Sequence, residues 1–432
     1  MASLPKSFNL SEPIPSLPDG AQSQLITCRP ISGSSFTPQS IIEIDLGNRG
    51  WCDPQSIAIR YKIAVTNDAT SNSCMVATPV YTPFQRVATL VGGAAIDSVN
   101  QYNQVAHVLT TGSLDIGQKY GLQTLYGYSN ATAGNMQYLD GRVGSAAGVT
   151  DTFYMSAPLI GTLLTNSEKQ LPLFAMPQIR FQFTLDSLAN MSYSNTGAAG
   201  VGFKDFTAVV LSNVELVYTM CDMGSSVEKM VYDLGSSVSI KTHGLSNSAV
   251  AVASGTSGSQ SFVFNQRFAS IRAAFACPNK VNGSRWAEIG DLTNGNGDYQ
   301  FLIGNQAFPQ APLSTVLNNA GVLQETRRAF GSIYDKNNCF SINSNEWTLY
   351  VNSAAGSLSY YEPGKFIVGC NLDKIQSGDH VMMSGASTYN TPISVNVNIN
   401  TATTAAANLN LILDYDAILV LDPVARQLSV RS

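Results

Sequence analysis

The clearest signal along the chain is an alternation of apolar and polar side chains with a period of two residues. Residues 57–65 place an apolar side chain at every second position, and residues 179–185 and 393–399 repeat the pattern. This period buries one face of a strand and exposes the other. Further strands are predicted by shorter apolar runs at 42–46, 214–220, 238–242, 262–276, 299–303, 347–351, 366–368 and 409–420.

The stretch 84–112 combines two patterns and organises the first half of the chain. It opens with a dense apolar run, and Gly92 and Gly93 then permit a sharp turn, because glycine adopts positive φ at little steric cost. From Tyr102 onwards, apolar residues recur three, four and seven positions later, which marks one face of a helix. We therefore expect a strand, a glycine turn, a short strand and a helix ending near Gly112.

Three other segments lack the strand period. Helical spacing predicts a helix over 320–330. The prolines in 308–312 predict a turn. Residues 113–151 show no periodicity and are rich in Gly, Ala, Ser and Tyr. We therefore expect a long loop that projects from the end of a β-barrel on the outer face of the molecule.

The chain is too long for one ordinary core and contains a weak internal echo. Its 432 residues suggest two domains. Residues 85–90 (QRVATL) resemble residues 266–271 (QRFASI), about half a chain apart. We interpret the echo as two copies of one β-domain, at 21–230 and 231–432, after an extended, proline-rich arm at 1–20. The predicted fold class is all-β, a pair of sandwiches or barrels with a few short helices between strands.

Charge is scarce along the whole chain. Charged residues make up 12% of the sequence, about half the share of a typical soluble domain, and the formal net charge is −5. Lys6 is the only basic residue among the first twenty, and Arg426 and Arg431 are too few to form a basic C-terminal tail. These features argue against nucleic-acid binding. A surface that repels its neighbours so weakly suits close contact with other protein.

Hydropathy and cysteine usage indicate the compartment. The longest apolar run, 409–421, is interrupted by Asp414 and Asp416, which we expect on the outer face of a strand, so no membrane span is predicted. The first twenty residues contain no apolar signal segment, so secretion is not indicated. The odd cysteine count without a C-x-x-C pair favours reduced thiols in a reducing intracellular compartment. The cysteines are Cys28, Cys52, Cys74, Cys221, Cys277, Cys339 and Cys370.

Motifs for catalysis or ligand binding are weak. His107, His243 and His380 could in principle belong to a Ser-His-Asp set, but no G-x-S-x-G elbow accompanies them and no metal-ligand spacing surrounds them. The segment 294–298 (NGNGD) resembles a calcium loop without its downstream acidic ligand, so a plain Asn-Gly turn is preferred. Phosphate-binding glycine motifs are missing. We therefore predict no enzyme activity and no catalytic, cofactor-binding or metal-binding residues.

An ordered set of stretches nevertheless resembles a known family. The run at 84–111 is similar to the first-barrel strand-and-helix signature of double jelly-roll major capsid proteins of the adenovirus, polinton-like virus, virophage and large DNA virus lineage. The chain is closest in size to the polinton-like virus and virophage members. Further similar stretches follow in the expected order at 171–187 with 212–224, at 261–276 with 299–315, and at 364–375 with 382–399.

The resemblance implies a specific role and specific partners. It implies two eight-stranded jelly rolls side by side, a homotrimer that forms a pseudo-hexagonal capsomer, and tiling of an icosahedral shell. The partners would be the chain itself, neighbouring capsomers, and penton and minor capsid proteins, with no sequence-specific nucleic-acid binding. The location would be the virion, and the resemblance leaves open whether that virion has an internal membrane.

Two other classes of function compete with the capsid interpretation. A carbohydrate-binding or fibre-type β-sandwich protein would have the same strand pattern, but it would need exposed aromatic platforms and usually secretion. A hydrolase on a β-scaffold would depend on one of the three histidines. Binding to glycans without higher assembly would favour the former, and turnover lost on mutation of a histidine would favour the latter.

Overall fold

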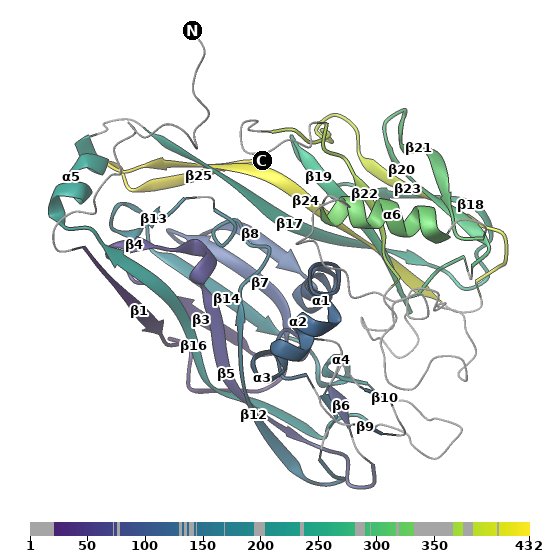
Figure 1. Cartoon of the computed structure of the whole chain (residues 1–432), viewed down its shortest axis with the longest axis horizontal. Helices are drawn as coiled ribbons and strands as arrows, with labels where there is room; N and C mark the ends of the chain where they lie inside the picture. The colour runs from purple at the N-terminus through teal and green to yellow at the C-terminus, as the bar shows by residue number, and fades with distance from the viewer. Residues whose placement is uncertain are drawn as a thin grey trace.

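The strands form two groups of sheets that follow one another along the sequence, as the computed structural model of the chain shows (Figure 1). The residues that the structure describes are 21–71, 73–75, 78–128, 132–133, 136–137, 142–143, 145–167, 169–193, 204–233, 237–280, 290–293, 295–316, 319–331, 366–374, 383–403 and 406–432. The arm predicted at 1–20 and the strand predicted at 347–351 lie outside these residues.

The first group pairs a large sheet with a four-stranded one. Tyr61 and Phe84, one from each sheet, meet edge-to-face with ring centroids 5.5 Å apart in the shared core. The large sheet runs β12 (Thr150–Pro158), β5 (Ala58–Thr66), β16 (Ala208–Asp222), β4 (Trp51–Cys52) and β13 (Leu171–Pro172), with β1 (Gln22–Cys28) and β2 (Ser35–Phe36) also paired to β16. The smaller sheet runs β3 (Ile41–Asp45), β14 (Ile179–Leu185), β7 (Phe84–Val91) and β8 (Ala94–Asn100).

The second group repeats this plan. Its first sheet runs β17 (Val238–Val252), β24 (Ala407–Asp422), β19 (Ile271–Lys280) and β22 (Val368–Asn371), with β25 (Gln427–Arg431) also on β24. Its second sheet runs β18 (Gly258–Phe264), β23 (Ile393–Ile399), β20 (Gly297–Ile303) and β21 (Gln306–Ser314). All pairings between these strands are antiparallel.

The strand order identifies each group as a jelly roll. The eight principal strands of the first group, in chain order, are β1, β3, β5, β7, β8, β12, β14 and β16, and those of the second are β17 to β24. In both groups the first, eighth, third and sixth strands form one sheet, and the second, seventh, fourth and fifth form the other. This is the jelly-roll topology of two interleaved Greek keys. The predicted all-β double jelly roll is therefore confirmed.

The alternating runs occupy the strands predicted from them. Along β14 and β23 every second residue is buried, and β5 follows the same pattern. On the outer face of β14, Arg180 donates to Asp45 at 2.6 Å and to Glu43 at 3.1 Å across the sheet. Polar residues at every second position thus pair with one another on the surface while their neighbours fill the core.

The organising stretch folds as predicted, with one difference. Gly92 and Gly93 adopt φ of 58° and 86° in the turn between β7 and β8. The helix α1 (Tyr102–Ser113) follows, but it is buried on nearly every side rather than on one face. Asn103 donates to the backbone of Thr82, and α1 also packs against β7 and α6 (Asn319–Phe330). The helix is enclosed by the fold, which a single-face spacing could not indicate.

The sequence echo at 85–90 and 266–271 does not mark equivalent positions. Residues 85–90 lie in β7, the fourth strand of the first roll, whereas residues 266–271 lead into β19, the third strand of the second. The true counterpart of the β7–β8 hairpin is the β20–β21 hairpin, whose two-residue turn at 304–305 is also followed by a helix, α6. The predicted doubling is correct, but this evidence for it was coincidental.

Two predicted loops contain regular structure. The segment 308–312 is part of β21 rather than a turn, since an edge strand tolerates proline on its unpaired side. Within 113–151 the structure places the helices α2 (Ile116–Gly121) and α3 (Gln123–Tyr126), and both Tyr126 and Tyr128 are buried. Only part of that segment is therefore surface. Short strands also occur there at β9 (Thr132–Ala133), β10 (Met136–Gln137) and β11 (Arg142–Val143).

The remaining elements are short. They are β6 (Cys74–Met75), β15 (Ser192–Tyr193), α4 (Leu188–Met191), α5 (Ser225–Asp233), and the single turns of 3-10 helix η2 (Pro54–Ser56) and η3 (Leu173–Ala175). The helix α5 leads from the last strand of the first roll toward the first strand of the second (Figure 1).

One buried hydroxyl of the helix α6 bonds the backbone at and beside β22. Thr326 Oγ1 accepts a hydrogen bond from the backbone N–H of Gly369 at 2.9 Å and lies 3.1 Å from the carbonyl oxygen of Ile367, to which it can donate. Thr326 is fully buried, so no water replaces these partners.

Replacing Thr326 by valine is expected to lower the free energy of unfolding by about 1–3 kcal/mol, because the buried N–H of Gly369 loses its acceptor. Thr326→Ser keeps the hydroxyl and should stay closer to the wild type. Chemical denaturation of the two variants measures the difference. Equal losses in both would show that this hydroxyl does not hold the helix.

Candidate assembly surfaces

The two jelly rolls meet along a continuous seam. In the described part of the chain, the hydrogen bonds that cross it join β17 of the second roll to the first roll. Thr242 Oγ1 donates to Leu163 O at 2.5 Å and Leu245 N to Gly161 O at 3.1 Å. Asn166 Nδ2 donates to His243 O at 3.0 Å, and Asn247 Nδ2 to Gln101 Oε1 at 2.9 Å.

The seam is closely packed as well as hydrogen-bonded. Gly161 has φ of 78°, and a Cβ built there would overlap the side chain of Leu245. Leu163 is fully buried beside Gly244. Glycine at both positions lets the backbones of the two rolls approach closely. Direct contacts therefore hold the two rolls together as one unit, and the connecting segment is not their only link.

One carboxyl group is buried at this seam. Asp97 of β8 accepts a hydrogen bond from Leu163 N at 2.9 Å and is 7% exposed. Burial raises the pKa of Asp97 to about 6, against the hydrogen bonds from Leu163 and Ser98, which lower it. Removing an ionised carboxylate from water costs more free energy than these two bonds return.

A pocket of about 300 Å³ also opens at the seam. Residues of both rolls line it, including Tyr81, Tyr126 and Asn166 from the first roll and His243 and Asp414 from the second. Tyr81 donates to the backbone of Pro158 at 2.8 Å. The lining of this pocket combines aromatic side chains with a few polar groups. Two of the polar residues, Asn166 and His243, also take part in the contact between the rolls.

The three histidines are not assembled into a catalytic set in the described part of the chain. His107 is buried in α1 with its Nδ1 3.2 Å from Thr78 Oγ1. His243 lies in β17 at the seam. His380 lies outside the described residues. Of the two described histidines, His107 thus lies in the core and His243 lies where the two rolls meet.

The prediction that Asp414 and Asp416 lie on the outer face of a strand is wrong for Asp416. Its side chain is 3% exposed, and it accepts a hydrogen bond from Ser270 at 2.6 Å. Arg272 lies 3.9 Å from both carboxylates and 3.8 Å from Asp373. Burial raises the pKa of Asp416. Asp416 alone in this charged cluster is fully buried, because it lies against Ser270 and Arg272 at the neighbouring strand β19, a contact that strand alternation does not indicate.

The loop before β20 is a turn organised by one buried carboxylate. Asp291 accepts hydrogen bonds from Thr293 N at 2.9 Å, from Gly295 N at 2.8 Å and from Tyr299 Oη at 2.8 Å. These neutral donors occupy its oxygens. Among the described residues, no group of three or more His, Cys, Asp or Glu side chains is arranged to hold a metal ion.

The described thiols are free. Cys28, Cys52, Cys221, Cys277 and Cys370 form no disulfide. Burial raises the pKa of Cys52 and of Cys370 to about 12. Thiols of such pKa stay protonated at neutral pH and react slowly.

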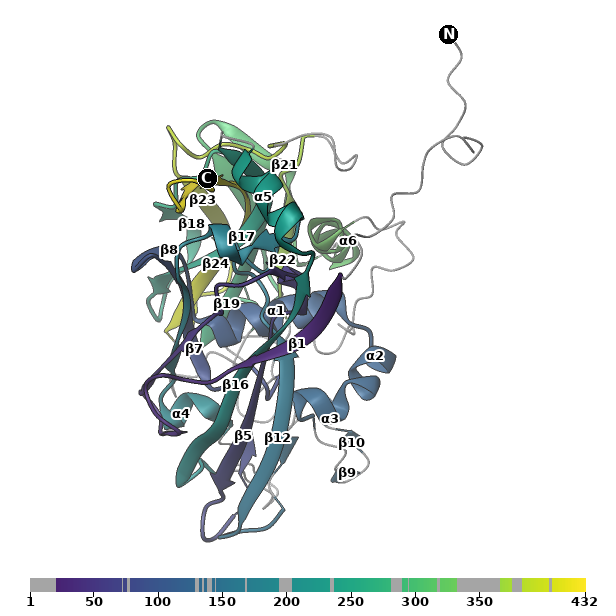
Figure 2. The same cartoon turned by 90° about the vertical axis from the view of Figure 1, so that its left-hand side faces the viewer.

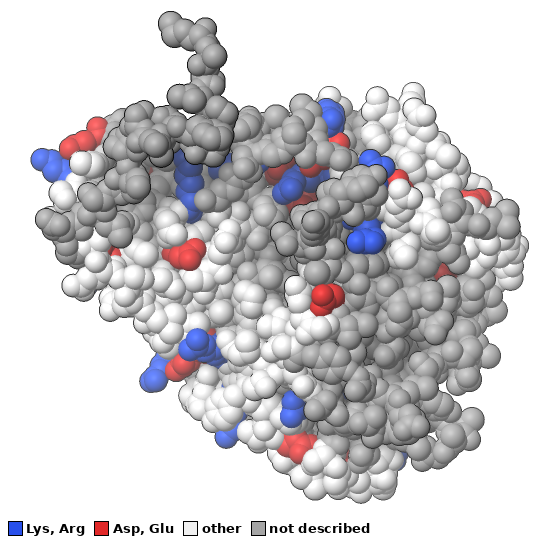
Figure 3. Space-filling model, viewed as in Figure 1, with Lys and Arg blue, Asp and Glu red and all other residues white. Residues whose placement is uncertain are grey.

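The exposed surface carries few charges. On the face drawn in Figure 3, blue and red atoms form a few small groups among uncharged ones. The outer face of the β18-β23-β20 sheet is built mainly from short polar side chains such as Ser261, Asn396 and Gln300. Within the described residues, no helix is long and apolar enough to cross a membrane.

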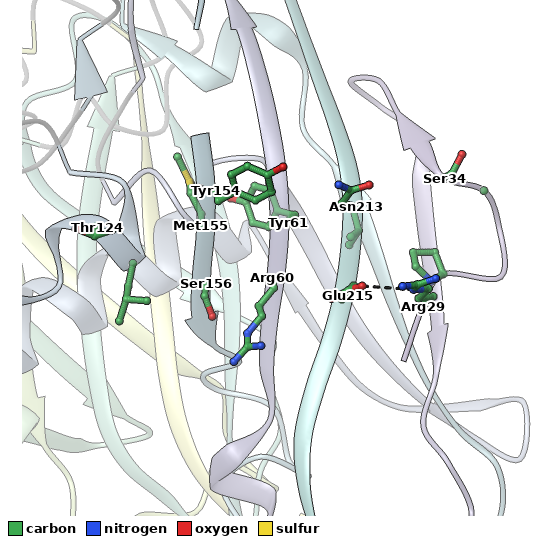
Figure 4. Close-up of a pocket in the computed structure, with 14 residues that line it drawn as sticks. Arg29, Ser34, Arg60, Tyr61, Thr124, Tyr154, Met155, Ser156, Asn213 and Glu215 are labelled. Carbon is green, nitrogen blue, oxygen red and sulfur yellow. Dashed lines mark hydrogen bonds and ion pairs between the residues drawn. The ribbon is translucent and has the colours of Figure 1, made fainter. Parts of the chain in front are cut away.

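A hollow of about 740 Å³ lies on the outer face of the first roll. Figure 4 shows its floor, where Arg60 of β5, Tyr154 of β12 and Glu215 of β16 project from neighbouring strands. Arg29 closes one side and pairs with Glu215 at 3.4 Å. Leu125 of α3 also lines the hollow. Tyr154 is 68% exposed, so much of a large aromatic residue is open to solvent beside a concave surface, with Lys62 Nζ 5.9 Å from the ring centroid.

Sequence reasoning missed the elements that build this hollow. Neither β1 nor β12 was predicted. The signal in β12 was weak, because only Met155 and Ala157 are fully buried and Phe153 is half-buried. In β1 no residue is fully buried, so the strand has no apolar face to detect. Sheet pairing with β16 holds it instead.

Comparison with known proteins rests on structure alone. No protein-family model and no curated sequence matches the chain. The Faustovirus major capsid protein superimposes with a TM-score of 0.61 and 9% identity over 95% of this chain and 92% of its own. The mavirus major capsid protein superimposes with a TM-score of 0.56 and 10% identity over 100% and 95%.

A third solved structure agrees with these two. PBCV-1 VP54, fitted into a reconstruction of the virophage Sputnik, gives a TM-score of 0.60 at 10% identity, with 95% of this chain and 97% of that chain covered. The chain has the double jelly-roll fold of viral major capsid proteins. Because both rolls and their connection are covered, the similarity extends to the tandem arrangement and not just to one sandwich.

Proposed function

We propose that this chain is a major capsid protein, the structural subunit that trimerises into pseudo-hexagonal capsomers and tiles an icosahedral virus shell. The observation that carries the proposal is the pair of complete jelly rolls in tandem, which matches two viral major capsid proteins over nearly the full length of every chain compared. The sparse surface charge supports it, because it favours many close protein contacts.

We propose that the chain acts by binding other subunits and that it catalyses no reaction. Each subunit would bind itself, then neighbouring capsomers and penton and minor capsid proteins, and it would reside in the virion after synthesis in a reducing compartment. The protonated thiols of Cys52 and Cys370 are compatible with that compartment. We assign no catalytic, cofactor or metal role to any residue. We also propose the division into rolls at 21–230 and 231–432, with α5 as the connection.

The oligomeric state of the purified chain tests the proposal. Light scattering after size-exclusion chromatography should give about three times the 46.0 kDa chain mass. A trimer is expected because each chain can contact its neighbours through both rolls at once, so that weak contacts add. A monodisperse monomer at high protein concentration would contradict a capsid role.

A carbohydrate-binding or fibre-type protein is the alternative. The exposed Tyr154 beside a concave surface is the feature that favours it, since aromatic rings stack on sugars. Binding on a glycan array that is lost in Tyr154→Ala, with no higher assembly, would support this alternative over the capsid role.

A further inference from the structure

The hollow on the outer face of the first roll contains a cation without a protein partner. Its strands β1, β16, β5 and β12 lie side by side in Figure 2, with α3 beside β12. The strand register places Arg60 of β5 opposite Glu215 of β16 and Ser156 of β12. Glu215 nevertheless pairs with Arg29 at 3.4 Å. Within the described residues, the exposed Arg60 side chain makes no hydrogen bond or ion pair, so its guanidinium is free to bind a ligand.

Positive charge gathers at this hollow. Arg29 and Arg60 line it, and Glu215 is the only acidic residue among the described residues of its lining. Lys62 adds a third cation beside it, with Nζ 5.9 Å from the centroid of the Tyr154 ring. The whole chain has a formal net charge of −5, so three cations around one carboxylate form a local excess of positive charge. Such a concave, positively charged surface attracts an anionic ligand.

One aromatic side chain lies within reach of the free guanidinium. Tyr154 is 68% exposed and lies opposite Lys62 in the strand register, and Arg60 is two residues from Lys62 on β5. Tyr154 and Arg60 are therefore diagonal neighbours on one face of the sheet, a position in which Cα atoms lie about 7–8 Å apart. A ring that stacks on Tyr154 can thus present an anionic substituent to Arg60.

A bulge in β16 adds uncharged hydrogen-bonding groups. The register shifts between Ser212 and Glu215, and Asn213 within the bulge has φ of 49°. Asparagine tolerates this left-handed conformation better than most residues do, and bulges often re-aim a side chain. Asn213 lines the hollow together with Ser156 (Figure 4), and in the part of the chain that the structure describes neither side chain makes a hydrogen bond. An amide and a hydroxyl are thus available to bond the hydroxyl groups of a ligand.

We propose that the hollow binds an acidic saccharide, with its sugar ring on Tyr154 and its carboxylate or sulfate group on Arg60 and Arg29. The planar guanidinium fork suits two-point bonding to such an anion. Arg29 can take part because its pair with Glu215 is exposed, and exposed pairs contribute little stability. The carboxylate of Glu215 then accepts hydrogen bonds from sugar hydroxyls. This binding function goes beyond assembly and is a property of the single chain.

Other anionic ligands fit the hollow less well. Successive bases of single-stranded nucleic acid need several stacking platforms, and Tyr154 is the only exposed aromatic side chain among the described residues of the lining. Glu215 would also repel a chain of phosphates. An acidic peptide would use Arg29 and Arg60 but would leave the amide of Asn213 without the hydroxyl partners of a sugar. The volume of about 740 Å³ lies in the range of small-ligand sites, about 300–1,000 Å³, and suits an oligosaccharide of a few units.

Titration calorimetry of the full chain with sialyllactose, sulfated lactose and lactose tests this inference. The two acidic sugars should bind, and neutral lactose should bind roughly tenfold more weakly or not at all, because it has no anion for Arg60. The tighter of the two acidic sugars identifies the carboxylate or the sulfate as the preferred group.

Two substitutions within the hollow should weaken binding of the preferred acidic sugar. Arg60→Gln removes the free charge and Tyr154→Ala removes the stacking surface, and each should lower the affinity roughly tenfold or more. Both side chains are exposed, so folding should be preserved. Arg60→Lys keeps the charge but not the fork, so its affinity should lie between those of Arg60→Gln and the wild type.

The second roll supplies matched controls. Tyr389→Ala removes a tyrosine that is 58% exposed, and Arg431→Gln removes an exposed arginine at the end of β25. Both variants should bind the acidic sugar as the wild type does. A loss of binding in either control equal to that in Arg60→Gln would overturn the placement of the site in the hollow.

The contrary outcomes are distinct. Equal affinity for lactose and the acidic sugars, or unchanged binding in Arg60→Gln, would overturn the proposal. Tighter binding of an oligothymidylate or a glutamate-rich peptide would also overturn it, because the hollow would then serve another class of ligand. Light scattering on the same samples separates this inference from the proposed function. A trimer that binds none of the sugars would overturn the inference and leave the assembly role standing, whereas a monomer that binds an acidic sugar would do the reverse.

Discussion

Gly297→Ala is expected to prevent the second jelly roll from closing, with a loss of about 3 kcal/mol or more in the free energy of unfolding. Gly297 opens β20 opposite Ile399 of β23. A Cβ at this position would overlap the backbone oxygen of Asn398 and lie 2.7 Å from Thr293. Backbone cannot rotate aside as a side chain can, so the strands must separate.

A second glycine supplies the matched control for this prediction. Gly121→Ala places its Cβ in open space at the end of α2 and should leave stability close to that of the wild type. Thermal unfolding followed by circular dichroism, with limited proteolysis to identify the roll that opens, measures both variants. Similar unfolding midpoints for Gly297→Ala and Gly121→Ala would show that β20 and β23 are not paired as described.

Asp97→Asn is expected to stabilise the seam between the rolls above pH 6 by up to about 3 kcal/mol. The folded pKa of Asp97 is raised to about 6 from the usual 3.8 because the carboxyl is buried. The folded chain therefore binds this proton more tightly than the unfolded chain does. The contribution of Asp97 to the free energy of unfolding therefore falls as pH rises from about 4 to about 6, and it stays constant at higher pH.

The comparison across pH isolates this residue from the other buried carboxyls. Burial also raises the pKa of Asp186, Asp291 and Asp416, so the total pH dependence has several sources. The difference in unfolding free energy between Asp97→Asn and the wild type should be near zero below pH 4 and largest above pH 6. The amide oxygen can still accept from Leu163 N. A difference independent of pH would contradict a buried carboxyl at the seam.

The central strands could be predicted because their two faces have different surroundings. In β14 and β23 one side meets the core and the other meets water, so alternation is complete. The helices α1 and α6 were predicted by the change from a period of two to helical spacing, with α1 ending one residue beyond Gly112. The tandem double jelly roll follows from these elements in order.

The candidate surfaces could not be predicted because they depend on contacts between distant parts of the chain. β1 has no buried side, and its place is set by pairing with β16 almost two hundred residues later. The alternation in β24 predicted a surface position for Asp416, but its side chain is buried where it accepts a hydrogen bond from Ser270. The similarity between residues 85–90 and 266–271 was misleading in a different way, since these similar sequences occupy non-equivalent strands of the two rolls.

An image of the purified oligomer along its symmetry axis tests the central claim most directly. Electron cryomicroscopy at a resolution that separates β-barrels should show six barrel densities in a ring with threefold symmetry, alternating between first and second rolls. Isolated pairs of barrels, or a twofold dimer in which identical rolls face each other, would contradict the account.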